Sequence, residues 1–286
     1  MLLRSWFLAL LIVPAVMSGA EDPAKPAYQY HYQTGKVAVG SGLATIDLPD
    51  GYRYLQTAEA RHVVEKEWNN PPDESTLGVV LPPGRDIDGD FAIIISFEET
   101  GYVKDDDAKT QDYAGLLKQM QEGTHESNPE RKKQGYPAME LLGWAEAPSY
   151  DSATKKMFWA KSLQVEGSPV PVLNYDIRVL GRRGVLEIGA IGALPQLADI
   201  AASGKEIMGK TEFTTGNRYA DFSEGSGDKI AAYGLAGLIA GGVLAKAGFL
   251  KLLWIGAIKL IKPLIFVFVV IGGVIAKLFG RGKKAA

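Results

Sequence analysis

The last 57 residues, from Ile230 to Ala286, contain eight lysines and arginines and no aspartate or glutamate. All 33 acidic residues lie before this point. Residues 21–229 hold them together with 22 basic residues and carry a net charge of −11. The near-neutral charge of the whole chain therefore conceals a sharp division. An acid-free, lysine-bearing apolar terminus is typical of membrane attachment, so we expect an acidic domain joined to a basic anchor at 230–286.

Two apolar segments occupy this terminus. Residues 230–250 are rich in glycine and alanine, and residues 260–279 contain the strongly apolar uncharged run 263–276. A helix needs about 20 apolar residues to cross the hydrocarbon core. We expect one span near 260–279, with 230–250 as a second, weaker membrane segment. A two-span helical hairpin is the alternative, although it divides the lysines and arginines evenly between the two sides.

The stretch between these segments, residues 251–262, has the pattern of an interfacial helix. At about 100° per residue its three lysines fall in one sector, and its tryptophan lies largely off that sector. Such a stripe suits lysines placed among anionic headgroups. The alternative is one long tilted helix with snorkelling lysines. The interfacial residues are Lys251, Trp254, Lys259 and Lys262.

Small residues recur four positions apart in both apolar segments, which would let helices approach closely. The candidates for helix packing in the membrane are Gly237, Gly241, Gly272 and Ala276.

The N-terminus, Met1–Ala20, resembles a secretory signal peptide. Arg4 precedes an apolar stretch, and Ser18-Gly19-Ala20 supplies the small residues of a cleavage site. An uncleaved anchor is the alternative, and export follows from either. We therefore expect a protein of the bacterial inner membrane whose main domain lies on the exported, periplasmic or extracytoplasmic, side. The chain has no cysteine, which excludes disulfides, thiolate catalysis and cysteine metal sites.

Residues 21–214 form the expected exported domain, and residues 215–229 a polar linker. Residues 173–180 alternate apolar and polar side chains, and a Gly-Arg-Arg-Gly turn leads from them into 185–191, which predicts a hairpin. Tight turns between strands favour an α+β fold, a mainly antiparallel sheet packed with a few helices. The other expected strands are 36–39, 42–48, 77–81, 91–97, 140–147 and 157–165. The expected helices are 58–68, capped by Thr57, 113–121, capped by Asp112, and 195–208.

Recognisable catalytic motifs are absent from the sequence. There is no G-x-S-x-G elbow, no P-loop and no dinucleotide-binding G-x-G-x-x-G. His31, His62 and His125 have no second histidine at metal-ligand spacing and are expected to be surface or packing residues. The negative charge of the domain, without a basic-aromatic platform, argues against nucleic acid as a partner.

Two acidic runs are weak candidates for a metal, and Ca²⁺ is the ion they would suit. The first alternates carboxylates as in a calcium loop, but Phe91 and Phe97 stand where an EF-hand needs glycine and glutamate. The second precedes the helix at 113–121. Ordinary solvated loops are the alternative for both. The residues are Asp86, Asp88, Asp90, Asp105, Asp106 and Asp107.

Several stretches resemble a bacterial family of predicted membrane-anchored proteins classified only as a domain of unknown function. They cover most of the chain after the signal peptide: residues 42–55, 71–72, 77–83, 97–108, 150–163 and 219–242. The resemblance implies an exported domain with a C-terminal anchor. It supplies no activity, cofactor or catalytic residue.

Taken together, the patterns favour a non-enzymatic envelope protein whose contacts are the lipid bilayer and an unidentified envelope protein or ligand. One alternative is an envelope enzyme that uses carboxylates such as Asp105–Asp107, Glu98 and Glu99, with or without a metal. Another is an accessory subunit of a membrane complex, joined through Gly237 and Gly241.

Overall fold

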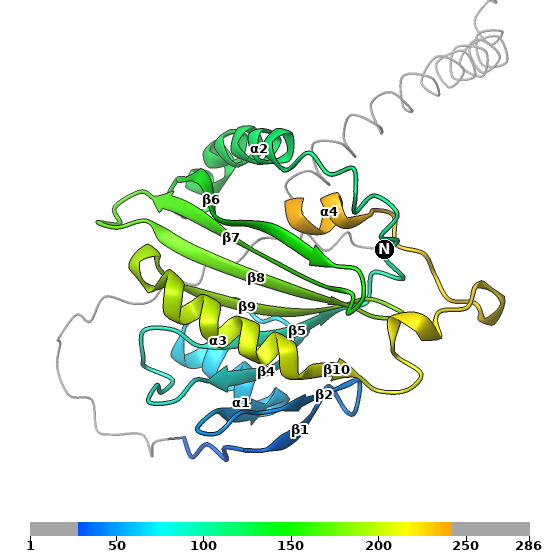
Figure 1. Cartoon of the computed structure of the whole chain (residues 1–286). Coiled ribbons are helices and arrows are strands. Elements are labelled where there is room, and N and C mark those ends of the chain that lie inside the picture. The colour runs from blue at the N-terminus through cyan, green and yellow to red at the C-terminus, as the bar shows by residue number, and fades with distance from the viewer. Residues whose placement is uncertain (1–27, 242–286) are drawn as a thin grey trace, which may run out of the picture. The chain divides into compact units, whose positions relative to one another are not determined.

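A computed structural model of the chain describes residues 28–241. The chain divides into two compact units, Met1–Ala240 and Gly241–Ala286, and the fold described here belongs to the first. It is built on a seven-stranded sheet and a three-stranded sheet, both antiparallel, with a small number of helices (Figure 1). The α+β expectation is confirmed.

The large sheet has the order β3-β4-β5-β9-β8-β7-β6, so β5 pairs with β9 across a long stretch of sequence. The hairpin of β8 and β9 has the expected register, with Leu180 opposite Val185 around the Gly-Arg-Arg-Gly turn. The strands are β3 (Arg53–Gln56), β4 (Thr76–Leu81), β5 (Ile93–Glu98), β6 (Met139–Asp151), β7 (Lys156–Val165), β8 (Val172–Leu180) and β9 (Val185–Ala193).

One face of this sheet carries the main apolar core. The small sheet of β1 (Lys36–Val39), β2 (Ala44–Asp47) and β10 (Thr211–Phe213) packs there together with α3 (Leu197–Lys210), which contacts β8 and β9. Figure 1 shows α3 lying across these strands. Fully buried Ile46, Ile200 and Ile207 contact the inward side chains of the sheet. This face is closed.

The helices on the opposite face pack mainly towards its two edges. At one edge α1 (Thr57–His62), continued by a π-helix at Val63–Glu67, packs on β3 and β4. At the other edge α2 (Tyr113–Lys133) packs on β6, and α4 (Leu235–Ala240) contacts α2. Tyr233, just before α4, approaches Glu98, Glu187 and Arg178 near the centre. Among the described helices, none has its main packing partner in β5, β9 or β8 on this face, and the candidate site lies there.

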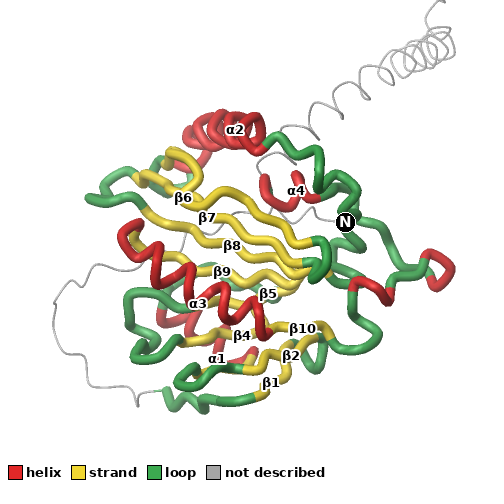
Figure 2. The backbone as a smooth tube through the Cα atoms, viewed as in Figure 1, coloured by secondary structure: helices red, strands yellow, loops and turns green. Residues whose placement is uncertain are grey.

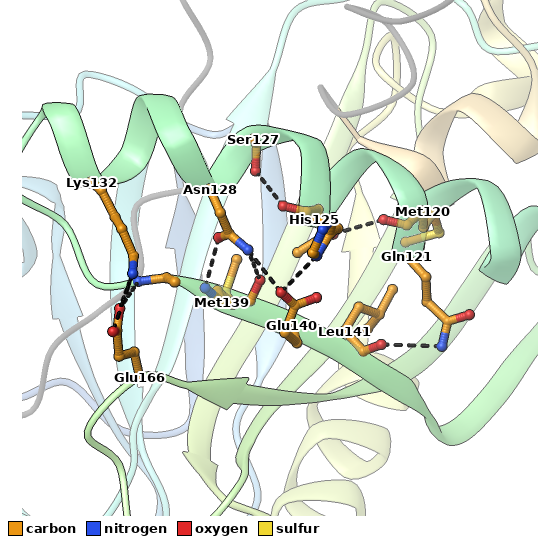
Figure 3. A network of polar contacts seen from close by, with 12 residues as sticks. Met120, Gln121, His125, Ser127, Asn128, Lys132, Met139, Glu140, Leu141 and Glu166 are labelled. Atoms are coloured by element: carbon orange, nitrogen blue, oxygen red, sulfur yellow. Dashed lines mark hydrogen bonds and ion pairs between the residues drawn. The ribbon is translucent and has the colours of Figure 1, made fainter.

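The length of α2 corrects the sequence prediction, which ended this helix at Gln121 and placed His125 in a loop. Asp112 caps the helix as expected and accepts from the Gly115 amide at 2.9 Å. The helix then continues to Lys133 because its polar side chains bind the edge strand β6 (Figure 3). The Asn128 amide donates to the Met139 carbonyl at 3.0 Å and accepts from the Met139 N–H at 2.8 Å. These contacts favour helix beyond its apolar part.

Two further details differ from expectation. Thr57 does not cap α1: it is the first helical residue, and its hydroxyl donates to the Leu77 carbonyl at 2.9 Å. Strand β3 was not predicted because its four residues lack an extended alternating pattern, and its pairing with β4 defines it.

No helix within residues 28–241 is both long enough and apolar enough to cross a membrane. The expected signal peptide at 1–20 and most of the expected anchor, residues 242–286, lie outside the described residues. So do the candidates Lys251, Trp254, Lys259, Lys262, Gly272 and Ala276.

Candidate functional site

Polar side chains lie at the centre of the seven-stranded sheet, on the face opposite α3. The alternation expected in β8 is confirmed: Leu173, Tyr175 and Ile177 point into the core, while Asn174 and Asp176, followed by Arg178, lie on the other face. The sequence pattern showed this polar row but not what lies beside it.

The pairing register of the neighbouring strands determines which side chains lie beside this polar row. Arg178 is opposite Glu187 of β9, and Glu187 in turn is opposite Ser96 of β5. Glu98 follows Ser96 on the same face of β5. On the far side of β8, Lys161 of β7 is opposite Asn174. We call this set the polar cluster: Ser96, Glu98, Lys161, Asn174, Asp176, Arg178 and Glu187.

Ion pairs run through the polar cluster. Lys161 Nζ lies 3.0 Å from Asp176 Oδ2, Arg178 Nη2 3.3 Å from Asp176 Oδ1, and Arg178 Nε 2.9 Å from Glu187 Oε1. The Asp176 side chain is 10% exposed and that of Arg178 12%. Burial alone would raise the pKa of Asp176, but the charges of Lys161 and Arg178 lower it below the ordinary aspartate value. The charges on Asp176 and Arg178 are thus paired and largely removed from water.

Glu98 differs from the other carboxyl groups of the cluster. Its burial, followed by the nearby Glu187 carboxylate, raises its pKa to about 8, although Arg178 acts in the opposite direction. Glu98 therefore holds a proton at neutral pH. A carboxyl with a strongly raised pKa, next to a carboxylate that lines a surface depression, is a candidate functional group.

Five of the seven residues of the polar cluster, all but Glu98 and Lys161, line one side of a depression of about 100 Å³. Gly189 of β9 lies at its floor, between Ile94 on β5 and Asp176 on β8. The lining residues are Ile94, Ser96, Asn174, Asp176, Arg178, Glu187, Gly189 and Ile191.

Only one member of the cluster, Glu98, was a candidate from the sequence, and Lys161, Glu187 and Ser96 were not predicted. One signal was available, since Lys161 interrupts the apolar side of the alternating stretch 157–165. The pairing of β5 with β9, which brings Ser96 and Glu98 to Glu187, left no signal in the sequence.

Asp105 forms a different kind of site. It accepts hydrogen bonds from Tyr150 at 2.6 Å, Lys155 at 2.7 Å and Tyr219 at 3.0 Å. Burial would raise the pKa of this carboxyl, but the three donors lower it below the usual range. Asp105 thus joins the loop after β5 to the β6–β7 hairpin and to Tyr219.

The other aspartate candidates are dispersed. Asp107 accepts from the Leu235 amide at 3.3 Å, while Asp106 is exposed. In the loop between β4 and β5, Asp86 accepts from Tyr32 at 3.1 Å, Asp90 pairs with Arg85 at 3.0 Å and Asp88 is exposed. No three His, Asp or Glu side chains within residues 28–241 are arranged to hold a metal ion. Calcium binding here stays a prediction.

The segment expected as a linker, 215–229, runs along the domain with short helical turns between β10 and α4 (Figure 2). Arg182 pairs with Asp228 at 2.7 Å. Tyr102 donates its N–H to the Lys229 carbonyl at 2.7 Å, and its ring stacks on Phe222 at 3.9 Å. Gly101 permits this approach, because a Cβ there would lie 2.7 Å from the Lys229 oxygen. The segment is therefore attached to the domain over much of its length.

The first part of the expected membrane segment 230–250 also contacts the domain. Leu235 and Ile239 of α4 are buried. Gly237 lies in α4, whereas Gly241 follows the end of the helix with a φ of 59°, so the described structure does not place the two on one helical face. Helix packing in the membrane through these residues stays a prediction.

The three histidines lie on the surface or in local packing. His62 stacks on Tyr28 at 3.8 Å, His31 pairs with Glu59 at 2.8 Å and His125 with Glu140 at 3.0 Å.

Comparison with known proteins gives a family but no activity. The model of a family described as protein of unknown function (DUF2167) matches residues 31–272, which confirms the resemblance found in the sequence. No curated protein shows significant sequence similarity to the chain.

Two solved structures have a distantly similar fold. A cyanobacterial PsbP (CyanoP) from Synechocystis sp. PCC 6803 is 7% identical with a TM-score of 0.37, and the match covers 68% of this chain and 98% of that protein. The Ran-binding protein Mog1p of Saccharomyces cerevisiae is 12% identical with a TM-score of 0.35, covering 68% and 100%. Likenesses this distant indicate neither a shared activity nor shared partners.

Proposed function

The chain belongs to the DUF2167 family of proteins of unknown function, and we propose that it is a membrane-anchored, non-enzymatic binding module of the bacterial cell envelope. Its described domain captures part of a partner protein at the depression over Gly189. The domain lies on the exported side of the inner membrane, and the C-terminal residues hold it to the lipid bilayer.

The polar cluster is the observation that carries the proposal. Removing charged groups from water is costly, and apolar residues of similar size often stabilise a fold equally well. The opposite face of the same sheet packs against an apolar core that includes Ile46, Ile200 and Ile207. The ion pairs of Lys161, Asp176, Arg178 and Glu187 lie instead beside an open depression. Their placement favours recognition over stability.

Attachment to the membrane is supported by the sequence. The acid-free terminus from Ile230 to Ala286, with its apolar run at 263–276, matches a lipid-embedded anchor with a basic flank. The signal-like N-terminus, Met1–Ala20, supports export.

Photo-crosslinking in intact cells tests the binding function. A photoreactive amino acid replaces Ser96 at the depression, and in a control it replaces Lys133, whose side chain is 79% exposed at the end of α2. We expect a reproducible crosslinked partner from position 96 and none from position 133. Equal yields from both positions, or none from position 96, would refute the proposed site.

The topology is tested separately with a reporter fused after Ala286. A single span near 260–279 places the tail on the cytoplasmic side, so a reporter that is active only after export stays inactive. Activity of that reporter would contradict the single-span arrangement.

A second candidate function, an acid/base enzyme, is favoured by one observation. Glu98 is protonated at neutral pH beside the Glu187 carboxylate, and a carboxyl pair with separated pKa values can divide the roles of acid and base. Activity profiling of the full chain decides between the two. Turnover of any substrate that Glu98→Gln abolishes and Glu99→Gln preserves would establish the enzyme.

A further inference from the structure

The depression exists because β9 has no side chain at position 189. A Cβ built on Gly189 would have a single neighbour within 4 Å, the Tyr175 carbonyl oxygen at 4.0 Å. Gly192, on the opposite face of the same strand, would place its Cβ 2.7 Å from Ile200 Cδ1. The glycine at 192 is required by close packing, whereas the one at 189 leaves open space.

The size of this space limits what can enter. Sites for complete small-molecule ligands and cofactors typically measure about 300–1,000 Å³. The depression measures about 100 Å³, which suits the terminal group of one side chain. Ile94 and Ile191 line it as well, so an aliphatic stem has apolar surface to contact.

The two cations beside the space are already engaged. The ionised groups of the cluster balance, since Asp176 and Glu187 face Lys161 and Arg178 while Glu98 is protonated at neutral pH. Arg178 already donates to the Ile177 carbonyl and pairs with two of the carboxylates, so few of its donors remain.

One carboxylate at the wall of the depression is less completely paired than the other. Asp176 is already engaged, since its buried Oδ2 lies 3.0 Å from Lys161 Nζ and its Oδ1 lies 3.3 Å from Arg178 Nη2. Glu187 Oε2 accepts a long hydrogen bond, 3.3 Å, from Ser96, and the protonated Glu98 is its other neighbour. An entering donor group finds the Glu187 carboxylate at this wall.

We propose that the depression over Gly189 receives the ammonium or guanidinium group of a lysine or arginine from the partner protein. This inference rests on the proposed function and specifies the chemistry of its ligand. The cation pairs with Glu187, and its stem lies against Ile94 and Ile191. The net charge of −11 on residues 21–229 attracts a basic partner over longer distances.

Four blocked tripeptides provide the test. Acetyl-Gly-X-Gly-amide, with X as arginine, lysine, citrulline or norleucine, is titrated into the full chain in lipid nanodiscs, and binding is followed by saturation-transfer NMR. We expect the arginine and lysine peptides to bind at least about tenfold more tightly than the two uncharged peptides, because a buried ion pair depends on the charge. Equal binding of all four, or no binding of the charged pair, would overturn the inference.

Variants locate the binding. Gly189→Leu fills the space and should abolish binding of the charged peptides, while Gly143→Leu, at an open strand position, should preserve it. Glu187→Gln keeps the shape and should weaken binding at least about tenfold, so the inference is testable even if the leucine variant folds poorly. Unchanged binding by both site variants would also overturn it.

Different results would refute the binding function and the cationic ligand. If position 96 crosslinks to a partner but the charged peptides do not bind, the site is an interface for other chemistry. If position 96 captures no partner, the binding function itself is refuted.

Discussion

Two partly buried carboxyl groups in this domain, Asp105 and Glu98, have opposite surroundings. Asp105 receives three hydrogen bonds, from Tyr150, Lys155 and Tyr219, and these lower its pKa in spite of burial. Glu98 is buried beside another carboxylate, and its pKa rises to about 8. The fold stabilises the charge on Asp105 and penalises the charge on Glu98.

This difference in surroundings indicates a structural role for Asp105 and makes Glu98 the candidate functional group. All partners of Asp105 come from within the domain, and together they attach Tyr219, and with it the segment leading to α4, to the β6–β7 hairpin. Glu98 lies beside Glu187, which lines an open depression together with Arg178. Glu98 avoids the cost of a second buried negative charge by keeping its proton, and Glu187 is the carboxylate that the proposed cation would meet.

The largest expected loss of stability comes from a change in the polar cluster. Arg178→Met leaves Asp176, Glu187 and Glu98 without their guanidinium, and breaking a buried ion pair from one side typically costs about 3–5 kcal/mol. We expect a loss of this size in the free energy of unfolding at neutral pH, measured by chemical denaturation. Arg183→Met, at the exposed turn, should cost less than about 1 kcal/mol. Similar losses in both variants would show that the cluster is effectively solvated.

A smaller loss of stability is expected at Asp105. Asp105→Ala leaves two tyrosine hydroxyls and the Lys155 ammonium without their acceptor, which should lower the free energy of unfolding by about 1–3 kcal/mol. Because the pKa of Asp105 is lowered in the folded state, its contribution is present at neutral pH and is lost as the pH falls below about 4.

The difference between wild type and Asp105→Ala should therefore shrink in acid. Asp106→Ala, which changes an exposed neighbour in the same run, is the matched control and should have little effect. A pH-independent difference would mean that the charge on Asp105 contributes nothing.

For Glu98 we expect stability to change with pH in the opposite direction. Its folded-state pKa of about 8 exceeds the unfolded value of 4.5, so the folded state retains a proton that the unfolded state loses as the pH rises between these values. Stability should fall with pH over this window, and Glu98→Gln should remove part of the decline. At pH 8 the variant should be more stable than wild type by about 1 kcal/mol or more.

Thermal or chemical unfolding across pH 4–8.5 measures this effect. Glu99→Gln, at the exposed neighbouring residue, should leave the wild-type pH profile intact. If Glu98→Gln has the same profile as wild type, Glu98 is ionised in the folded protein and the contrast with Asp105 disappears.

The smallest change in stability is expected for a substitution at Gly189. Gly189→Leu enters open space and should change the free energy of unfolding by no more than about 0.5 kcal/mol. Gly192→Leu, on the packed face of the same strand, meets Ile200 and Gln196 and should cost about 1–3 kcal/mol. An equal cost at both positions would show that the depression is closed in solution.

Part of the site was predictable from local sequence. The alternation at 173–180 placed Asn174, Asp176 and Arg178 on one face of a strand, because side chains alternate strictly in a pleated backbone. The turn at 181–184 then predicted the β8–β9 hairpin. Asp112 was recognised as a helix cap from the same kind of local rule, and the structure confirms it.

Interactions between distant residues were not predictable. Asp105 meets Tyr219, 114 residues away, and Ser96 meets Glu187, 91 residues away. The true end of α2 depends on bonds from Asn128 to β6, which no helical periodicity contains. These contacts depend on strand order and register, which are set by packing of the whole domain.

The amino-acid sequence alone determined the division into an acidic domain and an acid-free basic terminus, the α+β class and the strands with strict alternation. These properties depend on composition and on neighbouring residues. Only the tertiary structure decided that Glu98 lies beside Glu187 and that Gly189 leaves a depression beside charged side chains. The physical reason is that a pKa and a cavity depend on which groups pack together, and antiparallel pairing of β5 with β9 brings those groups together from distant parts of the chain.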